Sequence, residues 1–285
     1  MHRRFTSFAA HVLVACVPVL GLVMAVGAGT ASAAHSPVNA RAAALAALKH
    51  LKIGQHPTNQ PLPGHSARIR GAASTNWAGY ADKKTSGTYS KITGSWTQPK
   101  GSCGSGRPVA AFWTGIDGLT SSDPTVEQDG TLIECANGKA HYWSWWEMFP
   151  RNSVQMVSSA VRPGDHITSS VTRSGTKYTL KLTDSTHPGA SFSTTQTCAA
   201  ATCVDTSAEW IAEAPSNSSG VLPLAKFGSW TLTGATVKAG SKSGTIKTFP
   251  HEKITMVNNS GQVKGQTGAL NSAGNQFKVT LKRST

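Results

Sequence analysis

The sequence has few charged side chains, and no acidic residue lies before residue 71. Charged residues make up 14% of the 285 positions, and the formal net charge is +14. Seven of the 27 basic residues lie in positions 1–70, so the rest of the chain carries 20 basic and 13 acidic residues, a net charge of +7. That part contains no run of five basic residues and no nucleic-acid-binding motif, so we expect no nucleic acid partner.

Long apolar runs are also lacking, apart from one near the N-terminus. The run over residues 12–26 is short for a membrane span and has no stop-transfer flank. Arg3 and Arg4 precede it, and small residues follow it at 31–33. This pattern indicates a secretory signal peptide over residues 1–34. We therefore expect a secreted, extracellular protein that has no membrane association after signal cleavage.

The familiar catalytic motifs are absent. The sequence contains no Gly-x-Ser-x-Gly nucleophile elbow, no His-Glu-x-x-His zinc motif and no P-loop. It also lacks the Asp-Thr-Gly or Asp-Ser-Gly loop of pepsin-like enzymes. Four histidines follow residue 70, and none lies in a recognisable catalytic setting. No motif therefore supports hydrolysis based on histidine or zinc.

Cysteine is scarce, with five residues in the chain. Cys16 lies in the signal, which leaves Cys103, Cys135, Cys198 and Cys203, an even number that predicts disulfides in a secreted protein. The short separation of Cys198 and Cys203 favours a small loop between them, which would leave Cys103 with Cys135. The other two pairings stay open. Zinc binding is disfavoured because no histidine lies at ligand spacing from these cysteines.

Residues 35–70 are expected to form a pro-segment ahead of a domain over residues 71–285. The stretch from Val38 to Ile53 is rich in Ala and Leu, contains no Gly or Pro, and predicts a helix. A linker rich in proline follows, and the basic site at 68–70 is a place where processing could occur. The alternative is a helical N-terminal extension that stays attached.

From residue 74 onward, the sequence has the pattern of an all-β domain. Short runs of alternating apolar and polar residues are separated by turns rich in Gly, Ser and Asn. Residues 167–171 and 178–182 flank a turn at 173–175, which predicts a hairpin, and residues 277–281 alternate in the same way. Many short strands with regular turns predict a sandwich or barrel.

An aromatic segment over residues 142–150 is one candidate for a binding site. In a strand, Trp143, Trp145, Glu147 and Phe149 share one face. Aromatic rings beside a carboxylate would line a substrate groove. Plain core packing, with Glu147 satisfied by a hydrogen bond, is the alternative.

A second candidate is the strand-like run over residues 208–213, where Glu209, Ile211 and Glu213 share a face. A carboxylate in the middle of an apolar strand is costly unless it is paired or functional.

Asp117 ends another apolar run. The polar cluster at 127–130, read by itself, would be a surface loop.

Five segments occur in an order that resembles the glutamic peptidases of the eqolisin (peptidase G1) family. They are Asn76-Trp77-Ala78-Gly79-Tyr80, Phe112-Trp113-Thr114-Gly115-Ile116-Asp117-Gly118, Glu127-Gln128-Asp129-Gly130, Trp145-Trp146-Glu147-Met148-Phe149-Pro150 and Ala208-Glu209-Trp210-Ile211. The sequence departs from the fungal pattern at Met148, where an aromatic is usual, and in the long spacing between Asp117 and Glu147. Residues 231–285 match loosely. These departures indicate a bacterial-type branch.

The resemblance implies a concanavalin-like β-sandwich, or jelly roll, of two curved antiparallel sheets with the active site on the concave face. A short helical pro-segment would precede it. The resemblance also implies an acid-active endopeptidase that needs no metal or other cofactor, with Gln128 and Glu209 as its catalytic pair. We expect the substrate to be bound by Trp77, Trp113, Asp117 and Glu147. Expected partners are protein or peptide substrates, with the chain's own pro-segment as an inhibitor and a monomeric mature form.

Two other classes of protein fit the same pattern. A secreted carbohydrate-binding module or lectin would have the same sandwich and the same tryptophans without catalysis. A glycosidase would use two carboxylates, for example Glu147 and Glu209. The pairing of Gln128 with Glu209 favours the peptidase, because neither alternative requires a glutamine there.

Overall fold

The computed structural model describes residues 45–46, 48, 50–54, 71–84, 88–120, 123–198 and 203–285. The expected signal peptide, the linker and the basic site at 68–70 lie outside the described residues. Among the residues that are described, no helix is both long and apolar enough to cross a bilayer.

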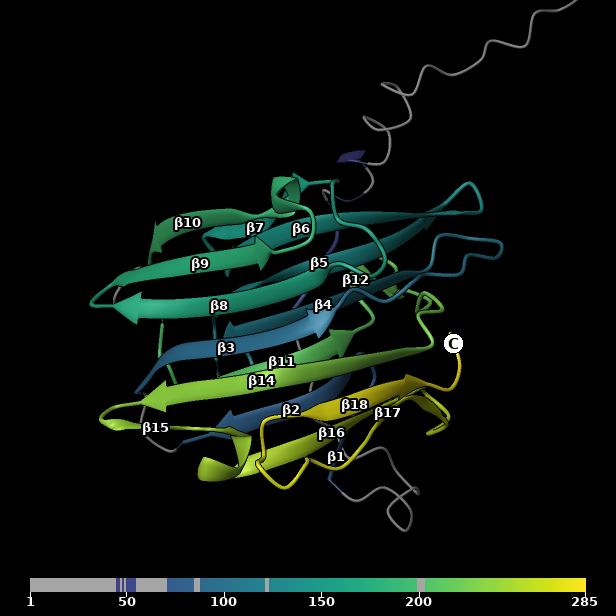
Figure 1. Cartoon of the computed structure of the whole chain (residues 1–285). Helices are drawn as coiled ribbons and strands as arrows, with labels where there is room; N and C mark the ends of the chain where they lie inside the picture. The colour runs from purple at the N-terminus through teal and green to yellow at the C-terminus, as the bar shows by residue number, and fades with distance from the viewer. Residues whose placement is uncertain are drawn as a thin grey trace, which may run out of the picture.

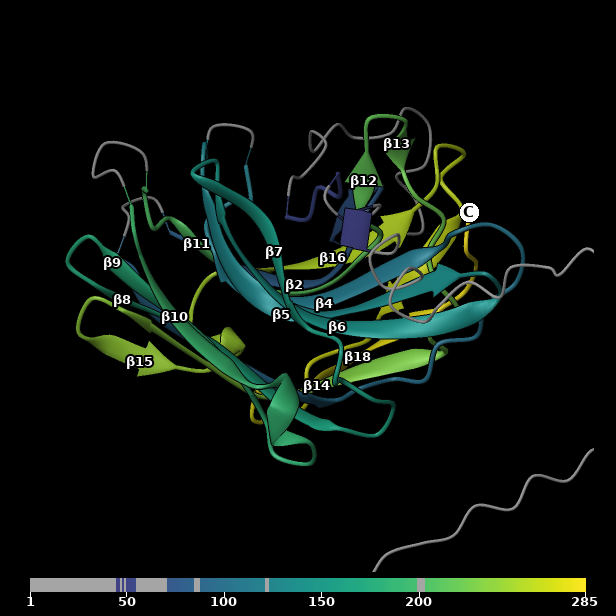
Figure 2. The same cartoon turned by 90° about the horizontal axis from the view of Figure 1, so that it is seen from above.

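Two curved antiparallel sheets pack face to face (Figures 1 and 2). The first consists, in spatial order, of β10 (Phe192–Thr197), β9 (Lys177–Asp184), β8 (His166–Ser174), β3 (Tyr89–Thr97), β14 (Ser229–Ala239) and β18 (Phe277–Leu281). The second consists of β16 (His251–Val257), β2 (Trp77–Lys83), β11 (Ser207–Glu213), β4 (Val109–Ile116), β5 (Val126–Ala136), β6 (Lys139–Phe149) and β7 (Asn152–Ser158). This arrangement confirms the expected β-sandwich.

Short elements complete the sandwich. Strand β17 (Val263–Thr267) pairs with both β18 and β16, so it joins the two sheets along one edge. The remaining elements are β1 (Ala72–Ser74), which is parallel to β16, β15 (Lys242–Gly244) beside β14, the hairpin of β12 (Ser216–Asn217) and β13 (Gly220–Val221), and the 3-10 helices η1 (Pro188–Ala190) and η2 (Ile246–Thr248).

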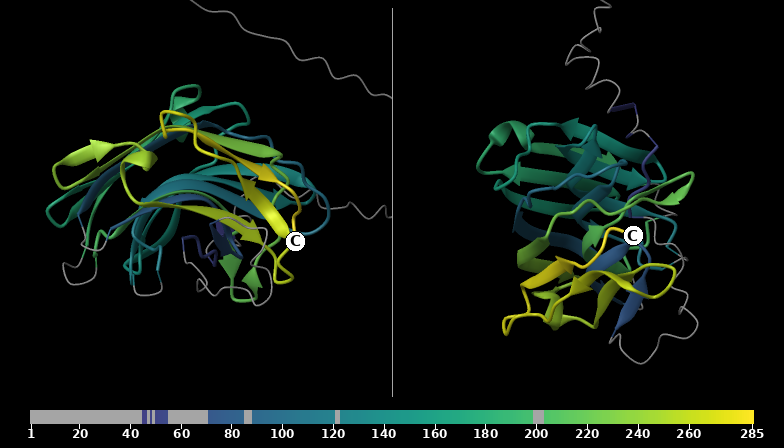
Figure 3. Two further views of the ribbon diagram at one scale, coloured as in Figure 1. Left: turned by 90° about the horizontal axis from the view of Figure 1, so that it is seen from below. Right: turned by 90° about the vertical axis from the view of Figure 1, so that its right-hand side faces the viewer.

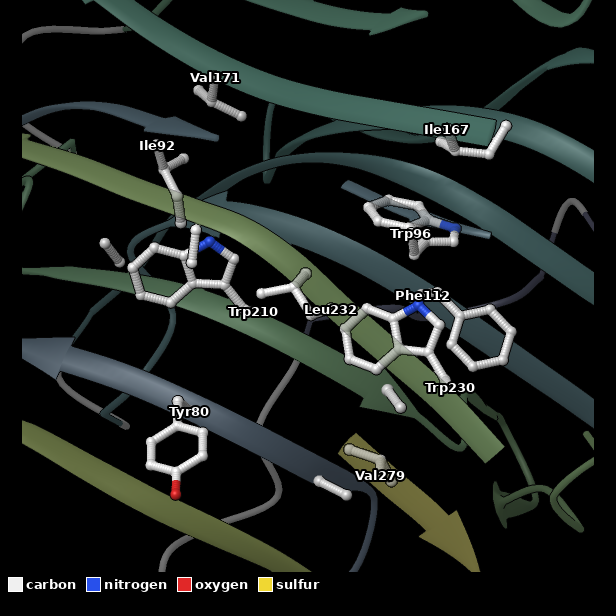
Figure 4. Close-up of a cluster of buried hydrophobic side chains, with 14 of the residues drawn as sticks. Tyr80, Ile92, Trp96, Phe112, Ile167, Val171, Trp210, Trp230, Leu232 and Val279 are labelled. Atoms are coloured by element: carbon white, nitrogen blue, oxygen red, sulfur yellow. The ribbon is translucent and has the colours of Figure 1, made fainter. Parts of the chain in front are cut away.

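The main core lies between the sheets and is rich in aromatic rings (Figure 4). The ring of Trp230 lies 5.5 Å from that of Phe112 and 5.9 Å from that of Trp96, and all three side chains are buried. Strand β4 sends Phe112 into this core and the next residue, Trp113, to the opposite face. Every residue of β4 is buried, because both faces of the second sheet are covered.

Several local expectations are confirmed. Strands β8 and β9 form the expected hairpin around Gly175, and residues 277–281 form β18. Two disulfides join Cys103 to Cys135 and Cys198 to Cys203, the pairing that the short separation favoured.

The expected helix over residues 38–53 is wrong at its C-terminal end. Leu45, Ala46 and Leu48 are helical, but the backbone of Lys52 instead exchanges two hydrogen bonds, of 2.8 and 3.0 Å, with that of Ser216. Leu48, Leu51 and Ile53 are buried against the second sheet. Packing and backbone pairing with a distant part of the chain therefore outweigh the helix propensity of this segment.

Candidate active site

A row of four paired residues crosses the outer, concave face of the second sheet. Glu209 on β11 is paired with Gly115 on β4, Gly115 with Gln128 on β5, and Gln128 with Glu147 on β6. Residues that are directly paired in an antiparallel sheet point to the same face. Gly115 places no side chain between Gln128 and Glu209, and a Cβ atom there would lie 3.0 Å from the Trp113 ring. Two strand spacings separate their backbones by about 10 Å.

Gln128 lies in β5, a strand whose interior is fully buried. The prediction of a surface loop, made from residues 127–130 alone, is therefore wrong. Its Nε2 group donates one hydrogen bond of 2.7 Å to Glu147 Oε2 and another of 3.0 Å to the main-chain oxygen of Ile53. Its Oε1 atom has no hydrogen-bond partner among the described residues. Gln128 therefore already donates to a peptide carbonyl, while its acceptor oxygen has capacity for a water molecule.

Glu209 is fully buried, and neither carboxylate oxygen has a hydrogen-bond partner in the described part of the chain. Burial raises the pKa of Glu209 well above its ordinary value, against a smaller lowering effect of Ser207. Burial likewise raises the pKa of Glu147, and the hydrogen bond from Gln128 opposes that shift. Both carboxyl groups therefore favour their protonated forms in this state of the protein.

An apolar floor surrounds the row. The rings of Trp77 and Trp113 meet edge to face at 5.1 Å, and both side chains are fully buried. Trp143, Trp145 and Ile211 extend the same face, as period two in β6 and β11 predicted. These side chains form one apolar cluster on the concave face.

Residues of the expected pro-segment cover this floor. Leu48, Leu51 and Ile53 belong to the same buried cluster as Trp77 and Trp113. Figure 2 shows the described residues before 55, in purple, beside the β12–β13 hairpin on the outer side of the second sheet. The left view of Figure 3 shows them from below, inside the hollow of that sheet. The structure is therefore that of a covered site.

Glu213 is a site residue that the sequence analysis did not select. Its Oε2 atom accepts hydrogen bonds of 2.9 Å from Trp113 Nε1 and from the backbone nitrogen of Gly54, and its Oε1 atom accepts one of 3.3 Å from Asn76 Nδ2. Burial raises its pKa to about 8, and the bonds from Gly54 and Trp113 oppose that shift. The sequence pattern that could have identified Glu213 is the alternation in residues 208–213, which places it on the same face as Glu209.

Asp117 occupies a different position from the other expected binding residues. Its carboxylate accepts hydrogen bonds from the backbone nitrogens of Val204, Asp205 and Thr206, at 3.1, 2.8 and 2.8 Å. Burial raises its pKa to about 6, against the lowering effect of the Asp205 and Thr206 N–H groups. The contacts of Asp117 therefore anchor the segment that leads into β11 and Glu209, whereas Trp77, Trp113 and Glu147 lie on the concave face.

Two clusters of potential metal ligands lie among the described residues, away from the row. One comprises Glu127 with Cys198 and Cys203, whose sulfur atoms form a disulfide and therefore offer no thiolate. The other comprises Asp165 just before β8, Asp184 at the end of β9 and His187 in the loop after β9. His187 Nδ1 and Asp165 are 2.5 Å apart, and Asp184 accepts the backbone N–H of His187 at 2.8 Å. Neither cluster includes a residue of the row.

Comparison with known proteins gives consistent matches. Residues 75–280 match the sequence model of the Peptidase A4 family. Aspergillopepsin-2 of Aspergillus niger is 26% identical over 199 residues, which span 60% of this chain and 66% of that protein, just under two thirds of its length.

Solved structures have the same fold. Scytalido-glutamic peptidase, crystallised with a peptide-based transition-state analog, is 23% identical with a TM-score of 0.61; the match covers 73% of this chain and 98% of that one. Aspergilloglutamic peptidase from Aspergillus niger is 24% identical with a TM-score of 0.53, over 61% of this chain and 99% of that one.

Proposed function

The chain belongs to the Peptidase A4 family, and from that membership we propose that it is a secreted, acid-active endopeptidase in which Gln128 and Glu209 hydrolyse peptide bonds. One observation carries the proposal: Gln128 donates a hydrogen bond to a peptide carbonyl at 3.0 Å, in the same row of the sheet as a buried, unpaired glutamate. The family and the sandwich agree with this chemistry. A peptide-based transition-state analog binds to the structurally similar scytalido-glutamic peptidase.

In the proposed mechanism, the Glu209 carboxylate takes a proton from a water molecule as the water oxygen attacks the carbonyl carbon. Gln128 Nε2 donates to the carbonyl oxygen as negative charge develops there, and Gln128 Oε1 orients the water. Glu209 then returns the proton to the leaving nitrogen while the C–N bond breaks. The products are a carboxylic acid and an amine, and no other reactant is needed.

Removal of the pro-segment is expected to change the protonation of Glu209. Burial in this state of the protein favours the protonated form of Glu209, which cannot act as a base. Exposure to water restores its ionisation in acid. Glu147 accepts a hydrogen bond from Gln128, and its ionisation at higher pH strengthens that bond at the expense of the substrate. Activity should therefore rise as Glu209 ionises and decline as Glu147 ionises.

Cleavage of denatured casein by the processed protein across pH 2–8 tests the proposed function. We expect cleavage in the acid range and little at neutral pH. A folded, fully processed protein that cleaves no peptide would contradict the peptidase. In that case, binding to immobilised polysaccharides would support the carbohydrate-binding alternative.

We further propose that residues 1–34 are a signal peptide, that 35–70 are an inhibitory pro-segment and that the mature form is a monomer. The departures from the fungal pattern support a bacterial-type branch. The contact of Ile53 with Gln128 and the burial of Leu48 and Leu51 support the inhibitory role. While these residues cover the face, a substrate cannot reach the pair.

Gly54 permits the close approach of the pro-segment to Gln128. Its φ is +75°, and a Cβ atom there would lie 2.3 Å from Gln128 Nε2. Gly54→Ala should therefore weaken inhibition by a synthetic peptide of residues 35–70 about 5- to 30-fold, the equivalent of one to two kcal/mol. The inhibition constant against the processed enzyme measures this. Lys52→Ala is the control, because the Lys52 side chain is exposed. Equal effects of the two substitutions would contradict the proposed contact.

A further inference from the structure

One peptide unit of the pro-segment is held at both of its polar atoms. The carbonyl oxygen of Ile53 accepts a hydrogen bond of 3.0 Å from Gln128 Nε2. The N–H group of the same unit, which belongs to Gly54, donates one of 2.9 Å to Glu213 Oε2. The C=O and N–H of a trans peptide point in opposite directions. Gln128 and Glu213 therefore bind this peptide unit from opposite sides.

The Glu213 carboxylate is held in place by the domain itself. Besides Gly54, it accepts hydrogen bonds from Trp113 Nε1 and Asn76 Nδ2, and Asn76 is in turn fixed by the Ser74 hydroxyl at 3.0 Å. In this covered state the side chains of Glu213, Trp113 and Asn76 have no exposed surface. An acceptor fixed in this way costs little further ordering when a peptide arrives.

The contact with Glu213 involves only the main chain. An interaction with a backbone N–H is available to any residue except proline, whose nitrogen carries no hydrogen. The same contact would therefore form with many peptides and would fix their direction and register relative to Gln128.

We propose that Glu213 is a substrate-binding residue that accepts the backbone N–H directly after the carbonyl held by Gln128. The inference rests on the proposed peptidase function. The pro-segment occupies the place of the substrate, and its Ile53–Gly54 unit marks where a peptide unit of the substrate lies. A substrate with proline directly after the Gln128-bound carbonyl lacks this contact and is a poor one.

Glu213→Gln is a suitable variant because Gly54, Trp113 and Asn76 all act as donors to the carboxylate. The amide has one acceptor oxygen in place of two, so its NH₂ group must face at least one donor. In kinetics of the processed enzyme with an unstructured peptide, we expect KM to rise about 5- to 30-fold with kcat within threefold, the pattern of a lost binding contact. Gln155→Ala, at an exposed position on β7, is the control and should leave KM unchanged.

A second measurement does not depend on activity. In the full-length chain carrying Glu209→Gln, which prevents self-processing, hydrogen exchange at the Gly54 amide reports on its bond to Glu213. We expect exchange to accelerate at least fivefold when Glu213→Gln is added. A folded Glu213→Gln protein with unchanged KM and unchanged exchange would overturn the inference. A wild type that cleaves nothing would refute the peptidase function instead, and the exchange result would still decide whether Glu213 holds a peptide N–H.

Discussion

Replacement of Glu209 by glutamine is expected to lower kcat by about 10²- to 10⁴-fold, the range for loss of a positioned general base. Glutamine has the same shape but cannot take a proton from water. Gln128→Ala is expected to cost about 10²- to 10³-fold, because one donor to the developing oxyanion is removed. Since both groups act on the same water and carbonyl, the double variant should be little worse than the poorer single one.

The measurement is steady-state hydrolysis of one peptide by each processed variant at the wild-type pH optimum. Thermal unfolding of each variant must show that the fold is intact. Gln155→Ala, at an exposed position on β7, is the control for Gln128→Ala and should retain full activity. Near wild-type activity in Glu209→Gln would disprove its role as the base and direct attention to Glu147 or Glu213, two other buried carboxylates on this face.

The protein is expected to be much less stable at pH 8 than at pH 4, because it buries several carboxyl groups without ion pairs. Burial raises the pKa of Asp82 to about 9, and burial, opposed by a hydrogen bond from Ser169, raises that of Asp129 to about 8. Glu213, on the concave face, has a pKa of about 8 for the same main reason.

The sign of this dependence follows from proton binding. These groups have a higher pKa in the folded protein than in the unfolded chain, where carboxyls titrate near pH 4. Between about pH 4 and pH 8, the folded state therefore binds more protons, and the free energy of unfolding decreases as the pH rises. Each pKa unit corresponds to about 1.36 kcal/mol. A combined loss on the order of 5 kcal/mol would lower Tm by roughly 10–20 °C for a domain of this size.

Thermal unfolding of the Gln128→Ala protein between pH 4 and pH 8 measures this effect, because that background removes no titrating group and prevents self-digestion. Asp82→Asn should reduce the fall in Tm, since Asp82 is fully buried and neither of its oxygens has a partner among the described residues. The partly exposed Glu252→Gln should not change it. A Tm that is equal or higher at pH 8 would contradict the burial of uncharged carboxyls.

The sequence by itself determined the class of fold and the faces of individual strands. Alternation in residues 142–150 correctly placed Trp143, Trp145 and Glu147 on one face, and the apolar neighbours of Glu209 correctly indicated a buried carboxylate. These are local properties, because the pleat of a strand alone decides which side chains share a face. The resemblance to a known family then selected Gln128, which local pattern had assigned to a surface loop.

Only the tertiary structure decided which of these faces meet. Glu209, Gly115 and Gln128 form one row because β11 pairs with β4, and β4 with β5, in a particular register; a shift by one residue would turn Gln128 to the other face. The contact of Glu213 with Gly54 likewise joins residues 159 positions apart. Such pairings depend on the packing of the whole sandwich, so no local pattern encodes them. For the same reason, the helical residues 45, 46 and 48 are not followed by further helix at Leu51. The concave face and the backbone of Ser216 provide burial and hydrogen bonds to Lys52 and its neighbours that this segment alone does not contain.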